Sequence, residues 1–65
     1  MVQERILENP CFIVFVGDKG YRIISKWSDY DHTEMYKNRR IEARMSILRN
    51  LTRQGYKEVP VEVFI

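Results

Sequence analysis

The sequence predicts a small α+β domain: a two-layer ββαβ sandwich in which one long helix lies on one face of a three-stranded, mainly antiparallel sheet. Three observations support this fold class: an entirely apolar run at 11–16, helical periodicity of apolar residues through the middle of the chain, and strict alternation at 59–65. The chain has 65 residues, so we expect a single domain over 1–65 with a small core.

The first two predicted strands form a hairpin. The segment CFIVFV at 11–16 is apolar at every position, which is typical of a central strand that is covered on both faces. A glycine-bounded turn at 17–20 leads into YRIISKW at 21–27, whose composition is again typical of a strand.

The sequence predicts a structure for the C-terminal end of the chain more clearly than for the N-terminal end. At 59–65 (VPVEVFI) every second residue is valine or isoleucine, and this alternation predicts a strand. Pro60 places that strand at a sheet edge. The N-terminal segment 1–9 is ambiguous, because its apolar residues fit a short helix or an additional edge strand equally well. Pro10 separates this segment from the first predicted strand.

A long helix is expected from His32 to Gln54. Asp31 is a suitable N-cap, Glu34 follows it at the spacing of a capping box, and Gly55 suits a left-handed helix stop. Such a helix is about 34 Å long at about 1.5 Å per residue, whereas a seven-residue strand spans only about 23 Å. We therefore expect the helix to overhang the sheet, to cross it obliquely, or to face a second strand that continues to about Tyr30.

The topology follows from a right-handed crossover between the second and third predicted strands. If the helix passes over the first strand, the strand order is 2-1-3, with the apolar strand in the centre and Pro60 at an edge. One helix covers only one face, so the other face must meet solvent, the N-terminal segment or another molecule. Some of the following side chains are expected on that face: Phe12, Phe15, Ile24 and Phe64.

Arginines interrupt the apolar stripe of the predicted helix in its first half only. At about 100° per residue, Arg40 and Arg44 fall near the centre of the arc that should face the core. Between 33 and 54, six basic residues accompany two acidic ones, so this segment carries +4 and the rest of the chain −2. Either the two arginines belong to an interface, or their stems cover the sheet rim while the guanidinium groups reach solvent or nearby carboxylates.

Motifs for catalysis are not found in the sequence, which has no P-loop, G-x-G-x-x-G, G-x-S-x-G or H-E-x-x-H pattern. The acidic cluster at 29–34 lacks the features of an EF-hand, and we interpret it as helix capping. Cys11, the only cysteine, is expected to be a small buried hydrophobe, the alternative being an intermolecular disulfide. Cys11 and His32 together are too few ligands for zinc, so we expect no metal. The small core and the absence of catalytic motifs lead us to expect no enzyme and no cofactor.

Two classes of partner fit the composition. No segment is apolar enough for a signal peptide or a membrane span, so we expect a cytoplasmic protein without a membrane partner. The alternative function is nucleic-acid binding, in which the basic helix lies along phosphates and strand aromatics stack on bases. We prefer a protein-binding module that self-associates as a homodimer through sheet faces or edge strands, and that serves as an inhibitor or accessory subunit of a larger enzyme. The residues expected to contact the partner are Lys37, Arg39, Arg40, Arg44, Tyr21, Trp27 and Phe64.

Overall fold

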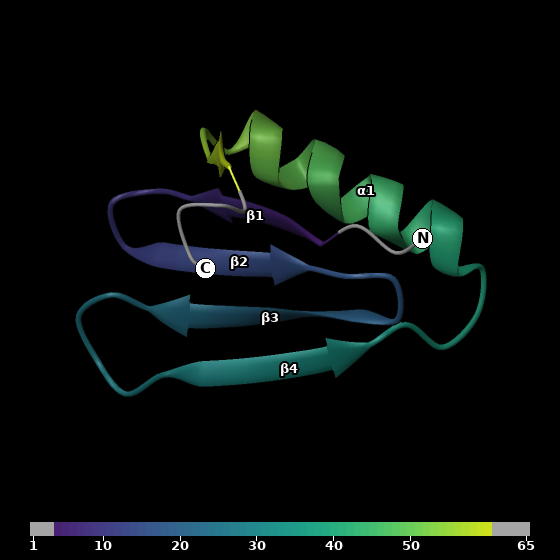
Figure 1. The fold of residues 1–65 in the computed structure, drawn as a ribbon, viewed down its shortest axis with the longest axis horizontal. Coiled ribbons are helices and arrows are strands. Elements are labelled where there is room, and N and C mark those ends of the chain that lie inside the picture. The colour runs from purple at the N-terminus through teal and green to yellow at the C-terminus, as the bar shows by residue number, and fades with distance from the viewer. Residues whose placement is uncertain (1–3, 61–65) are drawn as a thin grey trace.

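The computed structural model describes residues 4–60, which form an antiparallel sheet and one helix (Figure 1). The elements in chain order are β1 (Arg5–Glu8), β2 (Phe12–Val16), β3 (Gly20–Ser25), β4 (Asp31–Met35), α1 (Arg40–Arg53) and β5 (Lys57–Val59). The order across the sheet is β4-β3-β2-β1-β5. The α+β class is confirmed, but the sheet has five strands in the described part of the chain where three were expected.

The hairpin of β2 and β3 is confirmed. Its register pairs Val16 with Tyr21, and the N–H of Gly17 donates to the carbonyl of Gly20 at 2.9 Å. β2 lies in the centre of the sheet, as its continuous apolar sequence predicts, and Val14 and Val16 are fully buried there.

The ambiguous N-terminal segment supplies an interior strand. β1 pairs with β2 on one side and with β5 on the other, and both Ile6 and Leu7 are buried. The three expected strands keep the relative order 2-1-3, as β3, β2 and β5, but the expected pairing of the first with the last is wrong, because β1 lies between β2 and β5. β5 lies at the edge of the described sheet and ends before Pro60, but it shares only Val59 with the predicted strand 59–65. Residues 61–65 of that prediction lie outside the described residues.

The predicted start of the helix is also wrong. Residues 31–35 form β4 along the exposed side of β3, and α1 begins only at Arg40. Asp31 and Glu34 are thus strand residues and cap no helix; the N-cap is Arg39, with φ of 49° and no side-chain hydrogen bond. Residues 31–35 instead pair with β3, and Gly20, which has no side chain, leaves room for this close approach.

α1 is shorter than expected and fits the sheet. Its 14 residues extend roughly 21 Å, so the overhang expected of a 34 Å helix does not arise. Gly55 ends the helix region at φ of 93°, which confirms the left-handed stop. No helix in the described part of the chain is long and apolar enough to cross a membrane.

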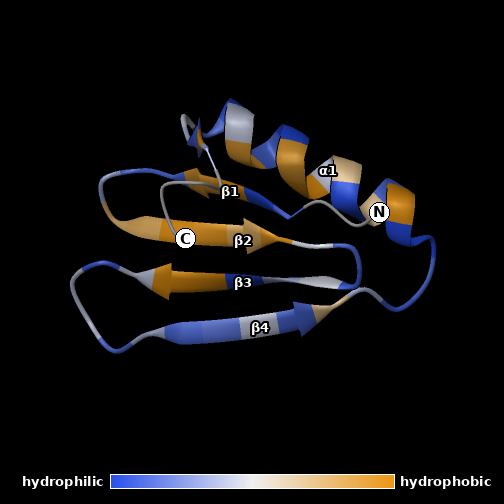
Figure 2. Cartoon of the chain, in the orientation of Figure 1, coloured by the Kyte–Doolittle hydropathy of each residue, from blue (hydrophilic) through white to orange (hydrophobic). Residues whose placement is uncertain are grey.

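The core lies between α1 and one face of the sheet. Its buried cluster consists of Leu7, Val14, Val16, Leu48 and Tyr56. Partly buried side chains pack around that cluster: Phe12, Tyr21, Ile23, Ile47 and Leu51. Figure 2 shows hydrophobic colour along β2 and at the end of β3, and hydrophilic colour along β4. The sheet is therefore apolar in its middle and polar at the β4 edge.

The opposite face carries the alternate residues of each strand. Alternation along β2 and β3 places Phe15 and Ile24 there, half-buried, as expected. Phe12 instead packs on the helix side, because it shares a face with Val14. Phe64 lies outside the described residues.

Candidate functional site

The basic residues before and at the helix start form an exposed group. Lys37, Arg39 and Arg40 are all exposed, and Nη1 of Arg39 lies 3.8 Å from Oε2 of Glu42. This group lies at the end of the sheet where β2 turns into β3 (Figure 1). The hydroxyl of Tyr36 donates to the carbonyl of Gly17 at 3.2 Å and ties the connection before the helix to that turn.

Arg44 belongs to the packed side of α1. Its side chain is half-buried, in contrast to that of Arg40. A hydrogen bond from Arg5 is the main cause that lowers the pKa of Glu58, and the charge of Arg44 adds to it. Burial raises the pKa of Tyr36, and the charge of Arg44 opposes that rise. The half-burial of Arg44 agrees with the interpretation that its stem covers the sheet.

The remaining predicted residues lie elsewhere. Tyr21 is half-buried against the helix-side core, and its phenol is part of the packing. Trp27 is 79% exposed and follows β3 at the end of the sheet opposite to the start of α1 (Figure 1). The structure therefore does not bring the predicted residues together into one site, and their role in binding stays a prediction.

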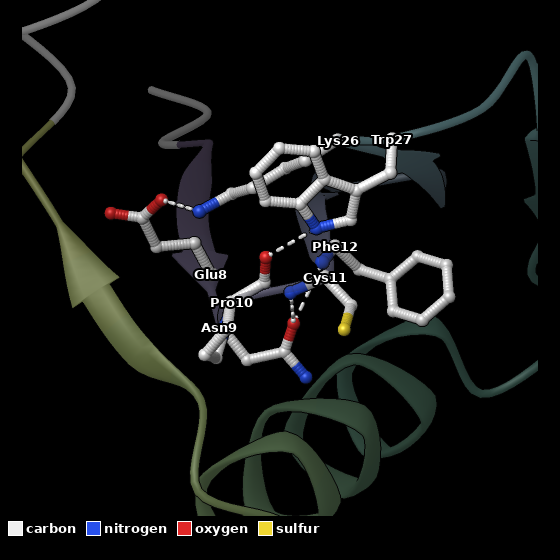
Figure 3. A network of polar contacts seen from close by, with 7 residues as sticks. All are labelled: Glu8, Asn9, Pro10, Cys11, Phe12, Lys26 and Trp27. Atoms are coloured by element: carbon white, nitrogen blue, oxygen red, sulfur yellow. Dashed lines mark hydrogen bonds and ion pairs between the residues drawn. The ribbon is translucent and has the colours of Figure 1, made fainter.

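The loop between β1 and β2 meets the loop between β3 and β4 at the end of the sheet that carries Trp27 (Figure 3). The side-chain oxygen of Asn9 accepts hydrogen bonds from the backbone N–H groups of Cys11 at 2.8 Å and Phe12 at 2.7 Å. The backbone N–H of Lys26 donates to the carbonyl of Cys11 at 2.8 Å, and its ammonium group lies 2.6 Å from Oε1 of Glu8. The turn before β2 and the start of the turn after β3 are thus joined to each other.

Trp27 is held against this joined pair of turns. Its indole N–H donates to the carbonyl of Pro10 at 2.9 Å, and its backbone N–H contacts the hydroxyl of Ser25 at 3.1 Å. The single polar atom of the side chain is therefore satisfied within the protein while the ring faces outward (Figure 3). The indole ring of Trp27 is thus an exposed apolar surface that is held in a defined position.

A second exposed aromatic ring lies nearby. Tyr30 is 52% exposed and contacts Phe12 edge to face, with the ring centroids 6.3 Å apart and the planes at 75°. Cys11 is exposed, so the expectation of a buried thiol is wrong; it lies in the bend before β2, where strand alternation does not direct it inward. We call this surface the aromatic end, made of Pro10, Cys11, Phe12, Trp27 and Tyr30.

A hollow of about 550 Å³ lies at the other end of the sheet. Its lining comes from the β2–β3 turn and from neighbouring positions of β2, β3 and β4: Glu4, Phe15, Gly17, Asp18, Lys19, Gly20, Tyr21, Arg22, Thr33 and Met35. Arg22 binds Asp31 through Nε to Oδ1 at 2.9 Å and through Nη2 to Oδ2 at 2.6 Å, and this hydrogen bonding lowers the pKa of Asp31. The residues that the structure describes contain no group of three His, Cys, Asp or Glu that could hold a metal ion.

No protein family, curated protein or solved structure matches this chain. The geometry therefore carries the functional argument. Of the aromatic end, the sequence predicts Trp27 as a partner contact, Tyr30 only as an aromatic that could stack on bases in the nucleic-acid alternative, and Pro10 only as a separator of two segments. The Asn-Pro pair at 9–10, a turn-forming dipeptide, was the available signal for an ordered loop at this place.

Proposed function

We propose that this chain is a small non-enzymatic protein-binding module, and that the aromatic end is its docking surface. The supporting observation is Trp27, whose ring is 79% exposed while its N–H is bound to Pro10. Tryptophan and tyrosine are enriched among the residues that dominate binding energy at protein interfaces. A ring that is already positioned also loses little conformational entropy when it docks.

The chemistry around Trp27 indicates the kind of partner. The indole ring is apolar. Beside it, Lys26 and Glu8 form an ion pair, so that each charge is balanced by the other. Such a surface fits an apolar pocket with a polar rim on a folded protein. An inhibitor or accessory subunit that inserts Trp27 into a larger enzyme is the form of this function that we favour.

Nucleic-acid binding is less well supported by the arrangement. The exposed basic residues Lys37, Arg39 and Arg40 lie at the end of the molecule opposite to Trp27 (Figure 1). A single strand that ran along the helix start would therefore not bring its bases to the exposed tryptophan. The proposal accordingly assigns the aromatic end to a protein partner.

The test uses Trp27 itself as the probe, because it is the only tryptophan in the chain. Proteins retained by the immobilised chain are purified and added back to it in solution; a true partner shifts the emission of Trp27 to shorter wavelength as the ring leaves water. Trp27→Ala should weaken binding by at least about tenfold, as expected for an anchor residue. The matched control is Ile41→Ala, which removes an exposed apolar side chain from α1 and should leave binding unchanged.

Two results would contradict this proposal. Binding of the purified partner that survives Trp27→Ala would remove the aromatic end from the interface. Quenching of Trp27 by a single-stranded oligonucleotide at low salt, lost as salt increases, would instead support the nucleic-acid function.

A further inference from the structure

The outer edge of β4 offers unpaired backbone groups in a regular pattern. At either end of the β3–β4 ladder, the N–H of Tyr36 donates to the carbonyl of Lys19 at 2.9 Å, and that of Ser25 to the carbonyl of Tyr30 at 3.0 Å. Hydrogen-bonded positions alternate along an antiparallel pair, so every second residue of β4 directs its backbone groups away from β3. The outward-directed residues are Asp31, Thr33 and Met35.

Within residues 4–60, no strand pairs with this edge. β4 is the last strand of the described sheet, and all five of its residues are exposed. Figure 1 shows α1 on the β1 side of the sheet, away from β4. A strand that carries free backbone groups in this way is a template for another strand.

We propose that the occupant of this edge is a second copy of the chain, with β4 antiparallel to β4 around a two-fold axis at Thr33. In this register Thr33 faces Thr33, and His32 of each copy faces Glu34 of the other. Within one copy, Nε2 of His32 already lies 3.0 Å from Oε1 of Glu34 on the same face of the strand. The dimer gathers two imidazoles and two carboxylates into one alternating group, which is complementary in hydrogen bonding and, when the imidazoles are protonated, also in charge.

The same side chains disfavour the neighbouring registers. A shift by two residues in one direction places His32 opposite His32, and a shift in the other places Glu34 opposite Glu34. Like groups directly opposite each other destabilise strand pairing, so the Thr33-centred register is the one specified. Asp31 does not add repulsion at the edge, because Arg22 of its own chain binds it through two hydrogen bonds.

The pairing extends each sheet into a continuous antiparallel sheet of two copies. The two-fold axis is perpendicular to the sheet, so both helices lie on the same side of it, each over the strands remote from the junction. The aromatic end is not part of this junction. The dimer is therefore independent of whether Trp27 docks on a partner protein.

A charge exchange between two chains tests the proposal. Glu34→Lys places an ammonium group opposite His32, and His32→Glu places a second carboxylate opposite Glu34, so each variant alone should dimerise at least about tenfold more weakly than the natural chain. An equimolar mixture of the two variants allows heterodimers in which opposite charges face each other, and the double variant H32E/E34K should dimerise with itself. Sedimentation velocity is measured up to roughly 1 mM, because a junction of one strand pair is smaller than a standard interface.

Each result decides for or against the junction. Monomeric single variants that associate on mixing support it, provided that circular dichroism shows both to be folded. A natural chain that stays monomeric at the highest concentration overturns it, as does a dimer that resists both single substitutions. A dimer abolished by Trp27→Ala also overturns it, because that result assigns self-association to the aromatic end.

Discussion

At the residue scale, Gly20 shows most directly how one position controls the sheet. A Cβ atom built there would lie 2.3 Å from the carbonyl oxygen of Glu34 and 3.0 Å from the Cα of Met35. Real Cβ contacts do not reach the shorter of these distances, and the obstructing atoms are backbone. The close approach of β4 to β3 therefore depends on the absence of a side chain at this position.

We expect Gly20→Ala to lower the free energy of unfolding by about 1 to 3 kcal/mol, as overpacking against an unyielding backbone does. Thermal melts followed by circular dichroism measure this loss. The matched control is Gly17→Ala in the same turn, where a Cβ would meet only the Gly20 carbonyl at 3.4 Å and the Glu4 carboxylate at 3.7 Å. Equal melting temperatures for the two variants would show that β4 tolerates displacement.

At the element scale, the side of α1 that packs on the sheet is displaced from the apolar arc that its sequence indicates. Leu48 is 9% exposed, whereas Ile41 is 75% exposed although both fall in the apolar arc of the helix. Met45 is exposed as well. The reason is that the side of α1 facing the sheet is shifted toward Ile47, which packs on the core, while Ile41 and Met45 lie at the other margin of the arc.

This difference predicts unequal costs for two truncations of the same helix. Leu48→Ala should lower the free energy of unfolding by about 2 to 5 kcal/mol, because it leaves a cavity against β2 and β1. Ile41→Ala should change it by less than about 0.5 kcal/mol, because its side chain already faces water. Urea titrations of both variants compare the two losses, and a similar loss for both would mean that the helix is rotated from the orientation described.

At the scale of the whole molecule, an ion pair joins the first and last described strands. Nε of Arg5 donates to Oε2 of Glu58 at 2.8 Å, across 53 residues of sequence. This hydrogen bond is the main cause that lowers the pKa of Glu58 from its usual 4.5 and raises that of Arg5. Both side chains are close to half exposed, so screening by water keeps the contribution of the pair below about 1 kcal/mol.

The sign of its pH dependence follows from linkage. Because the pKa of Glu58 is lower in the folded chain, the pair stabilises the fold above the unfolded value of 4.5 and loses that contribution as pH falls below it. Glu58→Gln should therefore be less stable than the natural chain at neutral pH, and the two should converge in acid. Melting temperatures over a pH series measure the difference, which should also shrink near about 1 M salt. A difference that persists in acid would mean that the charge of Glu58 is not its source.

The sequence by itself determined the α+β class, the β2–β3 hairpin, the central position of β2 and the helix stop at Gly55. These features depend on local periodicity and turn residues, which act over a few neighbouring positions. It also named Trp27, whose exposure matches its proposed role, without the turns that hold it.

Only the tertiary structure decided that β1 is an interior strand, that 31–35 is a strand and no helix start, and that the predicted contact residues lie at opposite ends of the sheet. Each of these depends on pairing between segments distant in the sequence. β1 becomes a strand because β2 and β5 lie on both sides of it, and β4 because Gly20 lets it approach β3. Strand formation reflects the neighbours that a segment meets in the fold, and these neighbours leave no local signal.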